Sequence, residues 1–281
     1  MRKGLFFVHL AILVAFLSIP SLASERLYPS YSQKYGYQVS EDMVSMKPVA
    51  TFRVFNQEFP PKKKDYVAAK KIEKIIQNSR RNYIRIKAKK VKGLERGMEV
   101  LVKTKVPYAS VKMESCYDDK LVWYRIDKKS YMNAIKLSKQ REKLIDEIIR
   151  ECGISSQTTQ RDAVLLISDY MRTHYHYDYK QLEDLTYWTQ IKGEYYLLYN
   201  NVGICEDYAV LYQALMHRIG IRCSMVLDTQ MNHRYNSVVI GGVEYYIDAC
   251  WDENLSYCKY VFMQEPDVSR IFNHHPGTKV W

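Results

Sequence analysis

A pair of adjacent glycines, Gly241 and Gly242, constrains the fold of this chain more than any other feature. They separate two runs, residues 235–240 and 243–249, that are rich in β-branched and aromatic side chains. Two glycines between such runs are a strong signal for a two-residue β-hairpin, because glycine adopts the positive φ angles that these turns require. The sequence therefore predicts an antiparallel hairpin across residues 235–249.

This turn also fixes which residues face each other. Pairing Ile240 with Val243 places His233 opposite Cys250 and puts His233 and Asp248 on the same face of the hairpin, as diagonal neighbours roughly 7–8 Å apart at the backbone. An imidazole and a carboxylate can span that gap. The other face is expected to be the core face, with Val238, Ile240, Val243, Tyr245 and Ile247.

A helix is predicted to begin at Cys205. Apolar residues at 211, 214, 215 and 219 recur at helical spacing, and Gly220 is a suitable stop. A strand is expected next, over residues 221–227. The start of a helix carries unpaired N–H groups and partial positive charge, which favour a thiolate over a thiol. Cys205 is therefore the candidate nucleophile.

The hairpin and the helix together predict a catalytic triad of Cys205, His233 and Asp248. Asp248 would hold one ring nitrogen of His233 while the other ring nitrogen faces the cysteine. Taken alone, a cysteine is usually a small buried hydrophobe and a histidine usually has a structural role. A nucleophile, a base and a residue that orients the base in one arrangement favour thiol acyl transfer instead.

These segments resemble the transglutaminase-like superfamily, which shares the architecture of papain-like thiol proteases. The family pattern G-x-C-x-x-[YF]-A is present at residues 203–209, its H-A-W-N-x-V at residues 233–238, and its D-x-T-[WF]-D at residues 248–252. The resemblance covers about residues 155–275. It departs at Arg234 and Tyr235, which replace the usual Ala-Trp, and at Cys250, which replaces the usual Thr. Cys250 would lie on the catalytic face, where it could oxidise with Cys205 or simply pack.

The resemblance implies an α+β fold, in which a helix with the cysteine at its N-terminus packs on an antiparallel sheet, preceded by an N-terminal accessory α/β region. It also implies that the backbone N–H of Cys205 and one donor from the preceding segment stabilise the oxyanion of the reaction. The candidates for that donor are Tyr195, Tyr196, Asn200 and Asn201.

The first 23 residues have the pattern of a signal peptide. Met1-Arg2-Lys3 supplies positive charge, residues 4–20 are nearly all apolar, and small residues precede an expected cleavage after Ala23. We therefore expect a secreted or cell-surface protein with an accessory region at 24–155 and a catalytic domain at 156–281. The alternative is an uncleaved membrane anchor, because the apolar run is nearly long enough to span a bilayer.

The accessory region is expected to begin with an extended leader and a basic amphipathic helix over 62–81, followed by strands at 82–88, 98–106, 111–114 and 121–126. Two helices are expected next, at 137–152 and 159–174, the second capped by Ser156 or Thr158. The apolar face of the first helix would contain Val67, Ala68, Ile72, Ile75 and Ile76.

The chain has a net charge of +11, and +9 would remain after removal of Arg2 and Lys3. A basic exported protein could meet anionic wall polymer, lipid headgroups or acidic protein. Nucleic acid is not expected, because the basic residues are spread over the chain and no nucleic-acid motif organises them. Six cysteines occur without metal-binding spacing, so no metal and no cofactor are expected.

The expected reaction is hydrolysis of a peptide or carboxamide bond in a protein or peptide substrate, through a thioester on Cys205. Two alternatives remain open. An amine could resolve the thioester, which would make the protein a cross-linking transglutaminase. The fold could also serve as a non-catalytic cell-surface binding module. The sequence contains no calcium-binding loop of the D-x-D-x-D-G type, which weakens the analogy with calcium-dependent cross-linking enzymes.

Overall fold

The computed structural model describes residue 36 and residues 38–49, 61–106, 111–118, 121–180 and 194–280. The expected signal peptide at 1–23 and most of the expected leader lie outside these residues. Among the residues that are described, no helix has both the length and the apolar content needed to cross a membrane.

The N-terminal part is a small α/β unit. Its elements are α3 (Lys63–Asn78), β1 (Tyr83–Lys87), the short 3₁₀ helix η2 (Ala88–Lys90), α4 (Leu94–Lys105), β2 (Met113–Asp118) and β3 (Leu121–Asp127). The strands form an antiparallel sheet in the order β1-β3-β2. The buried face of α3 contains Ala68, Ile72 and Ile76 as expected, but Val67 is 60% exposed.

The strand expected at 98–106 is wrong, because this segment is part of helix α4. The β-branched valines at 100, 102 and 106 suggested a strand. The buried side chains of Leu94, Met98 and Leu101 follow helical spacing, and this face packs on α3. The packing is close, because a Cβ atom on Gly97 would lie only 2.7 Å from the Cβ atom of Ala68. The packing of α4 on α3 therefore stabilises a helix, rather than a strand, in this segment.

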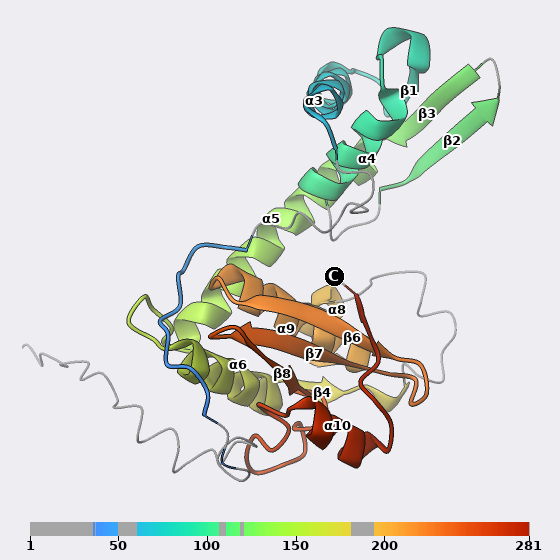
Figure 1. The fold of residues 1–281 in the computed structure, drawn as a ribbon. Coiled ribbons are helices and arrows are strands. Elements are labelled where there is room, and N and C mark those ends of the chain that lie inside the picture. The colour runs from blue at the N-terminus through green and yellow to red at the C-terminus, as the bar shows by residue number, and fades with distance from the viewer. Residues whose placement is uncertain are drawn as a thin grey trace, which may run out of the picture.

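A long helix, α5 (Lys128–Glu151), joins this unit to the C-terminal part (Figure 1). It begins nine residues before the expected position 137. The side chain of Asp127 accepts a hydrogen bond from the backbone N–H of Ser130, which caps the first turn. With 24 residues, α5 is about 36 Å long. The accessory sheet and the C-terminal sheet therefore lie at opposite ends of α5 (Figure 1).

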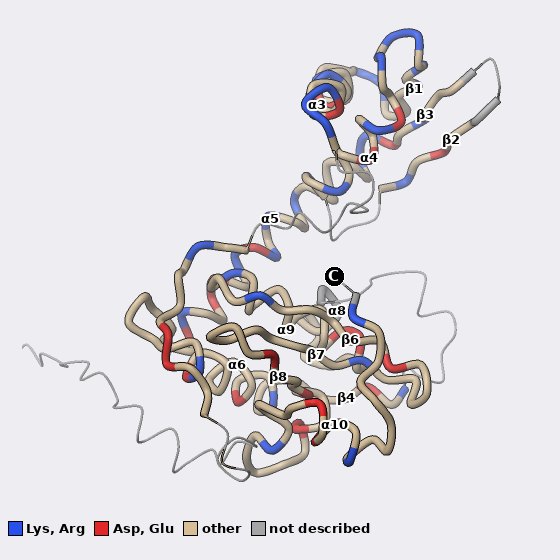
Figure 2. Tube along the Cα trace, in the orientation of Figure 1, with Lys and Arg blue, Asp and Glu red and all other residues tan. Residues whose placement is uncertain are grey.

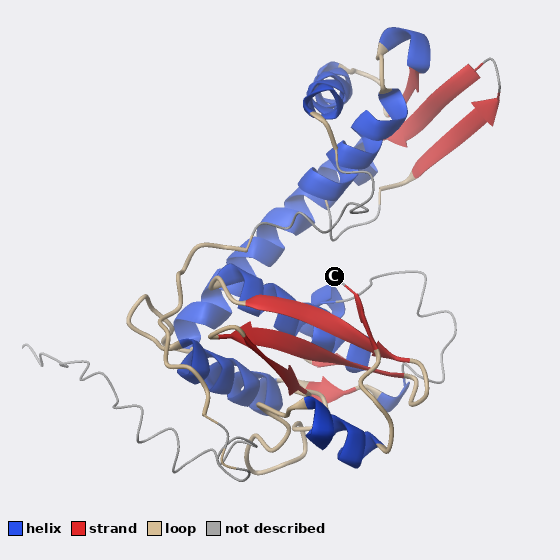
Figure 3. Ribbon diagram, in the orientation of Figure 1, coloured by secondary structure: helices blue, strands red, loops and turns tan. Residues whose placement is uncertain are grey.

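The C-terminal part is built on a four-stranded antiparallel sheet in the order β8-β7-β6-β9 (Figure 3). The strands are β6 (Arg222–Asp228), β7 (His233–Ile240), β8 (Val243–Ile247) and β9 (Thr278–Val280). Two shorter strands, β4 (His176–Tyr177) and β5 (Val202–Gly203), pair in parallel beside this sheet. The helices are α6 (Gln160–His174), α8 (Glu194–Asn200), α9 (Cys205–Arg218) and α10 (Glu265–Phe272).

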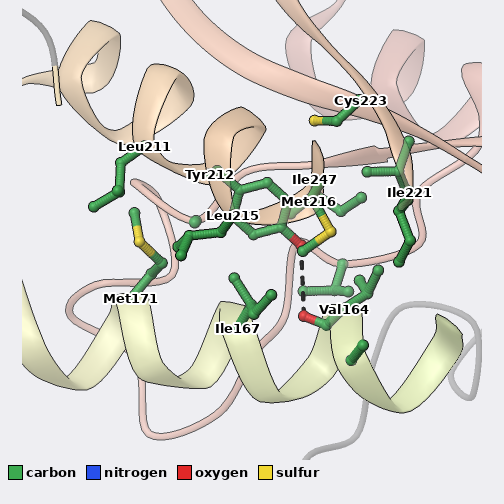
Figure 4. Close-up of a cluster of buried hydrophobic side chains, with 14 of the residues drawn as sticks. Val164, Ile167, Met171, Leu211, Tyr212, Leu215, Met216, Ile221, Cys223 and Ile247 are labelled. Atoms are coloured by element: carbon green, nitrogen blue, oxygen red, sulfur yellow. Dashed lines mark hydrogen bonds between the residues drawn. The ribbon is translucent and has the colours of Figure 1, made fainter. Parts of the chain in front are cut away.

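The fold class expected from the sequence is confirmed. Helix α9 begins at Cys205 and packs on β6 and β7, and α6 packs on α9. The core between α6, α9 and the sheet contains Tyr212, whose hydroxyl donates to the carbonyl of Val164 (Figure 4) and lies 3.0 Å from the hydroxyl of Ser168. The cap of α6 is Thr159 rather than Ser156 or Thr158, because its hydroxyl accepts from the N–H of Asp162.

The hairpin register predicted from the two glycines is confirmed where the strands pair. Ile240 faces Val243, and the ladder runs back to Asn236, which faces Ile247. Beyond that point the strands separate, because the N–H of Asp248 donates to the carbonyl of Tyr260 instead. The expected core face is buried with one exception, since Val243 is 44% exposed beside the turn.

Candidate active site

Cys205 occupies the first position of α9. The residue before it, Ile204, is extended and leaves the helix without a side-chain cap of its own. The Asp207 carboxylate accepts a hydrogen bond from the N–H of Ile204 at 3.0 Å and is buried. A Cβ atom on Gly203 would lie 2.7 Å from Leu197 and 3.0 Å from Asp207, so a side chain there does not fit without movement. Cys205 itself is 7% exposed.

His233 begins strand β7 and is held by Asp248. Its Nε2 atom lies 2.6 Å from the Oδ2 atom of Asp248. The other carboxylate oxygen of Asp248 accepts from the N–H of Trp251 at 3.0 Å, and Asp248 is fully buried. The Cys205 side chain also forms a hydrogen bond with His233. Because Nε2 is taken by Asp248, Nδ1 is the ring nitrogen left for the sulfur.

The structure therefore brings all three candidate triad residues together. His233 lies between Cys205 and Asp248, as the shared hairpin face predicted. Their catalytic role stays a prediction at this point.

The electrostatics around His233 favour a protonated ring. Burial lowers the pKa of His233, but the charge of Asp248 and the hydrogen bonds to Asp248 and Cys205 outweigh it. The result is a pKa raised from 6.5 to about 10. At neutral pH the ring is then an imidazolium next to a cysteine sulfur, and such a neighbour favours the thiolate form of a cysteine.

Aromatic rings cover the His233–Asp248 pair. Trp251 stacks on the imidazole with 5.4 Å between ring centroids, Tyr235 stacks at 6.0 Å, and Phe272 meets it edge-on at 6.5 Å. An apolar cover limits access of water, which strengthens the hydrogen bond beneath it. Tyr235 and Trp251 thus shield the imidazole and its hydrogen bond to Asp248 from water.

Asn236 ties the strand that carries the histidine to the helix that carries the cysteine. Its side-chain amide donates to the backbone carbonyl of Ala209 at 2.9 Å and lies 3.4 Å from that of Ser224. Asn236 is buried, so these bonds replace contacts with water. The sequence motif contained this asparagine, but its task could not be inferred without the packing of β7 on α9.

A second group that the sequence reasoning missed is Tyr177. It pairs with Gly203 in the short β4–β5 ladder and packs against the core cluster that includes Cys205. Burial raises the pKa of its phenol, and the charges of Cys205 and Cys250 raise it further, so the hydroxyl stays protonated. The alternation of residues 173–179 was the only sequence signal for this strand. The neighbourhood of Tyr177 and Cys205 depends on the fold.

The four candidates for the oxyanion donor are not brought to the sulfur by any described contact. The side chains of Tyr195 and Tyr196 lie outside the described residues. Asn200 is the last residue of α8, Asn201 follows it, and both are exposed.

Cys250 lies close enough to Cys205 for its charge to act on the Cys250 thiol, but the pairing that would place Cys250 opposite His233 is not formed, because the ladder ends at Ile247. It is 8% exposed, and the charge of Cys205 contributes to raising the pKa of its thiol, after burial and the charge of Asp248. All six cysteines are free thiols.

A further buried carboxyl group, Asp252, lies next to this site. Its Oδ1 atom accepts from the backbone N–H groups of Lys259 and Tyr260, while its Oδ2 atom is buried without a hydrogen-bond partner. Burial raises the pKa of Asp252 to about 7. The two N–H donors oppose this rise, and the charge of Asp248 adds to it.

A second histidine–carboxylate pair lies directly beside the first, because Asp228 faces His233 in the β6–β7 ladder. The Nε2 atom of His274 lies 2.5 Å from the Oδ2 atom of Asp228, which is buried. Among the described residues no cysteine is hydrogen-bonded to this pair, so it offers a neighbouring control for the first. The described residues contain no group of three or more His, Cys, Asp or Glu side chains arranged to hold a metal ion.

Residues 147–263, which include Cys205, His233 and Asp248, match the family model of the transglutaminase-like superfamily. No curated protein matches the sequence. Among solved structures, the chain resembles one described as the crystal structure of a TGase, with 14% identity and a TM-score of 0.34 over 49% of this chain and 43% of that one. It also resembles a proposed cysteine protease from Cytophaga hutchinsonii, with 13% identity and a TM-score of 0.32 over 66% of this chain and 71% of that one. The chain thus spans less than half of the first structure.

Proposed function

Because residues 147–263 form a domain of the transglutaminase-like superfamily, we propose that the protein is an exported thiol hydrolase that cleaves peptide or carboxamide bonds through Cys205, His233 and Asp248. The observation that carries this proposal is the contact of His233 with both Cys205 and Asp248. Export rests on the sequence pattern of the first 23 residues alone.

In the resting state, the ring of His233 carries a proton at neutral pH and lies next to the sulfur of Cys205, as its raised pKa supports. Asp248 accepts the hydrogen bond from Nε2 and thereby orients Nδ1 toward the sulfur.

In the first step, the thiolate attacks the carbonyl carbon of the substrate and a tetrahedral intermediate forms. The backbone N–H of Cys205, at the start of α9, is a suitable donor to the oxyanion. The proton on Nδ1 of His233 passes to the leaving amine as the carbon–nitrogen bond breaks. A thioester between the acyl group and Cys205 results.

In the second step, His233 takes a proton from a water molecule, which attacks the thioester. The carboxylic acid leaves, the proton returns the ring to its charged form, and the thiolate is restored. If a lysine amine attacked in place of water, the same thioester would give an amide cross-link. The two outcomes differ only in the acceptor.

A product analysis tests the proposal. The protein and its Cys205→Ala variant are incubated with a mixture of cell-surface proteins, with and without a primary-amine probe, and the products are identified by mass spectrometry. Hydrolysed peptide or amide bonds that appear only with the intact cysteine are expected. Incorporation of the amine in place of hydrolysis would make the enzyme a transglutaminase, and identical products from both proteins would leave only a binding module.

A pair of histidine variants provides the control. His233→Ala is expected to abolish product formation, whereas His274→Ala removes the histidine of the second pair on the same sheet. Equal losses in both variants would mean that the effect is structural, and the assignment of His233 would fail.

A further inference from the structure

The positive charge of this protein is concentrated in one short part of the chain. Residues 61–105 hold 16 of the 42 Lys and Arg residues but 4 of the 31 Asp and Glu residues. Their net charge is therefore +12, and the rest of the chain together carries −1. The expectation from the sequence that basic residues are spread evenly is corrected by this count. Figure 2 shows the basic segments along α3, the turn after β1 and α4.

Part of this charge surrounds a cavity of about 1000 Å³ between the start of α3 and the start of α4. Six cationic side chains line it: Lys62, Lys63, Lys64, Lys71, Lys92 and Arg96. Val67, Ala68 and Val91 supply apolar lining. The cavity is thus lined by both basic and apolar side chains.

The acidic side chain at the cavity is hydrogen-bonded within the protein. Asp65 is the single acidic residue among the described residues that line it. It is 4% exposed, and its carboxylate accepts a hydrogen bond from the backbone N–H of Lys62 at 2.8 Å. Arg96 is paired with Glu99.

The lysines, in contrast, are available to a ligand. Lys63, Lys71 and Lys92 are exposed, and their ammonium groups form no ion pair with any other described residue. Five uncompensated ammonium groups around one hollow attract anions, and the positive ends of the α3 and α4 helix dipoles add to that field.

From this arrangement we infer that the cavity between α3 and α4 is a binding site for a soluble polymer of closely spaced phosphate groups. Lysine acts on phosphate as a compact point charge, and five such charges suit several phosphates of one strand. None of the described residues that line the cavity is aromatic, so this part of the surface lacks the stacking platforms that nucleic-acid bases require. Its concave shape fits a strand better than the plane of a lipid surface.

The site is remote from the thiol centre. α5, about 36 Å long, separates the unit that contains the cavity from the sheet that carries His233 (Figure 1). The cavity would therefore anchor the protein on an anionic polymer and leave the thiol centre free. This inference stands on its own and does not depend on the thiol chemistry.

The test measures binding of end-labelled inorganic polyphosphate to the full protein by fluorescence anisotropy, over a range of about 0.05 to 0.3 M salt. The cavity variant carries Lys63→Ala, Lys71→Ala and Lys92→Ala. The matched control carries Lys129→Ala, Lys136→Ala and Lys143→Ala on the exposed surface of α5, so both variants lose the same net charge.

If each cavity lysine neutralises one phosphate, each contact lowers the affinity by about 0.7 log units for every tenfold rise in salt. Losing three contacts therefore weakens binding about 100-fold at 0.1 M salt. The cavity variant is expected to show this loss and a shallower salt dependence, and the control variant to stay within about threefold of the unchanged protein.

Three results would overturn the inference. Equal losses in both variants would mean that binding follows net charge rather than the cavity. Tighter binding to anionic vesicles or to duplex DNA than to polyphosphate would assign the surface to a membrane or to nucleic acid. Absence of polyphosphate binding at the lowest salt would remove the site altogether. Circular dichroism of both variants verifies that the fold is retained.

Discussion

Replacing Asp248 with asparagine changes the charge next to His233 while keeping the size of the side chain. In the intact protein, the pKa of His233 is raised from 6.5 to about 10, and the charge of Asp248 is the largest cause of the rise. That difference corresponds to about 5 kcal/mol of preference for the protonated ring. With asparagine the charge is gone, while burial, which lowers the pKa of this histidine, remains.

The expected pKa of His233 in the Asp248→Asn variant is therefore at or below 6.5. At pH 8, a ring with a pKa of about 10 is about 99% protonated, whereas one at about 6.5 is about 3% protonated. The imidazolium that donates its proton to the leaving amine becomes about 30-fold rarer. We expect hydrolysis at pH 8 to fall by at least that factor, and further if the neutral ring adopts the wrong tautomer.

The assay has two readings. Nitrogen-15 NMR of the imidazole measures the pKa of His233 directly, and initial rates at pH 8 measure hydrolysis. Asp228→Asn is the control, because Asp228 faces His233 in the β6–β7 ladder but bonds to His274 instead. A His233 pKa that stays above about 9 in the Asp248→Asn variant, or a rate within about threefold of the unchanged protein, would refute the reasoning.

Three further predictions concern packing and pH. Gly203→Ala would push a Cβ atom to 2.7 Å from Leu197, so the free energy of unfolding, measured by urea denaturation, is expected to fall by about 1 to 3 kcal/mol. Asn236→Ala removes the donor to two buried carbonyl groups, so the free energy of unfolding is expected to fall by about 1 to 3 kcal/mol. Because β7 and α9 lose the hydrogen bond that connects them, kcat is expected to fall more than KM changes. The pKa of Asp252 is raised from 3.8 to about 7 and that of His233 from 6.5 to about 10, so both groups bind a proton more tightly when folded. The stability that each group contributes is therefore present below the lower pKa and is lost as the pH rises to the higher one. In the Asp252→Asn variant, the fall in the free energy of unfolding between about pH 4 and 7 is expected to disappear. A free energy of unfolding that depends on pH in this range as it does in the unchanged protein would contradict the burial argument.

The hairpin and its register were predictable because two adjacent glycines leave one favoured turn. Once Ile240 faces Val243, strand alternation decides which side chains share a face. The start of α9 at Cys205 was predictable from apolar spacing and the glycine after the helix. The triad geometry therefore followed from local signals that lie within about 45 residues of one another.

Other features depended on contacts between distant segments. Helix α4 was mistaken for a strand because β-branched valines recur there, and only packing on α3 makes its helical face visible. The place of Tyr177 depends on a two-residue ladder with Gly203, which no sequence pattern announces. The unpaired oxygen of Asp252 likewise arises because two chain segments close over it. The cavity between α3 and α4 brings the lysines at the start of α3 close to Lys92, which precedes α4.

The central claim is that the sulfur of Cys205 is an activated nucleophile, and its alkylation rate tests this most directly. The native protein is treated with limiting iodoacetamide at pH 6, and modified cysteines are located by mass spectrometry. Cys116, which is partly exposed and lies in the accessory unit, is the internal reference for an ordinary thiol. The account predicts that Cys205 is alkylated at least about tenfold faster than Cys116 and that this advantage disappears in His233→Ala. A rate for Cys205 no greater than that for Cys116 would contradict it.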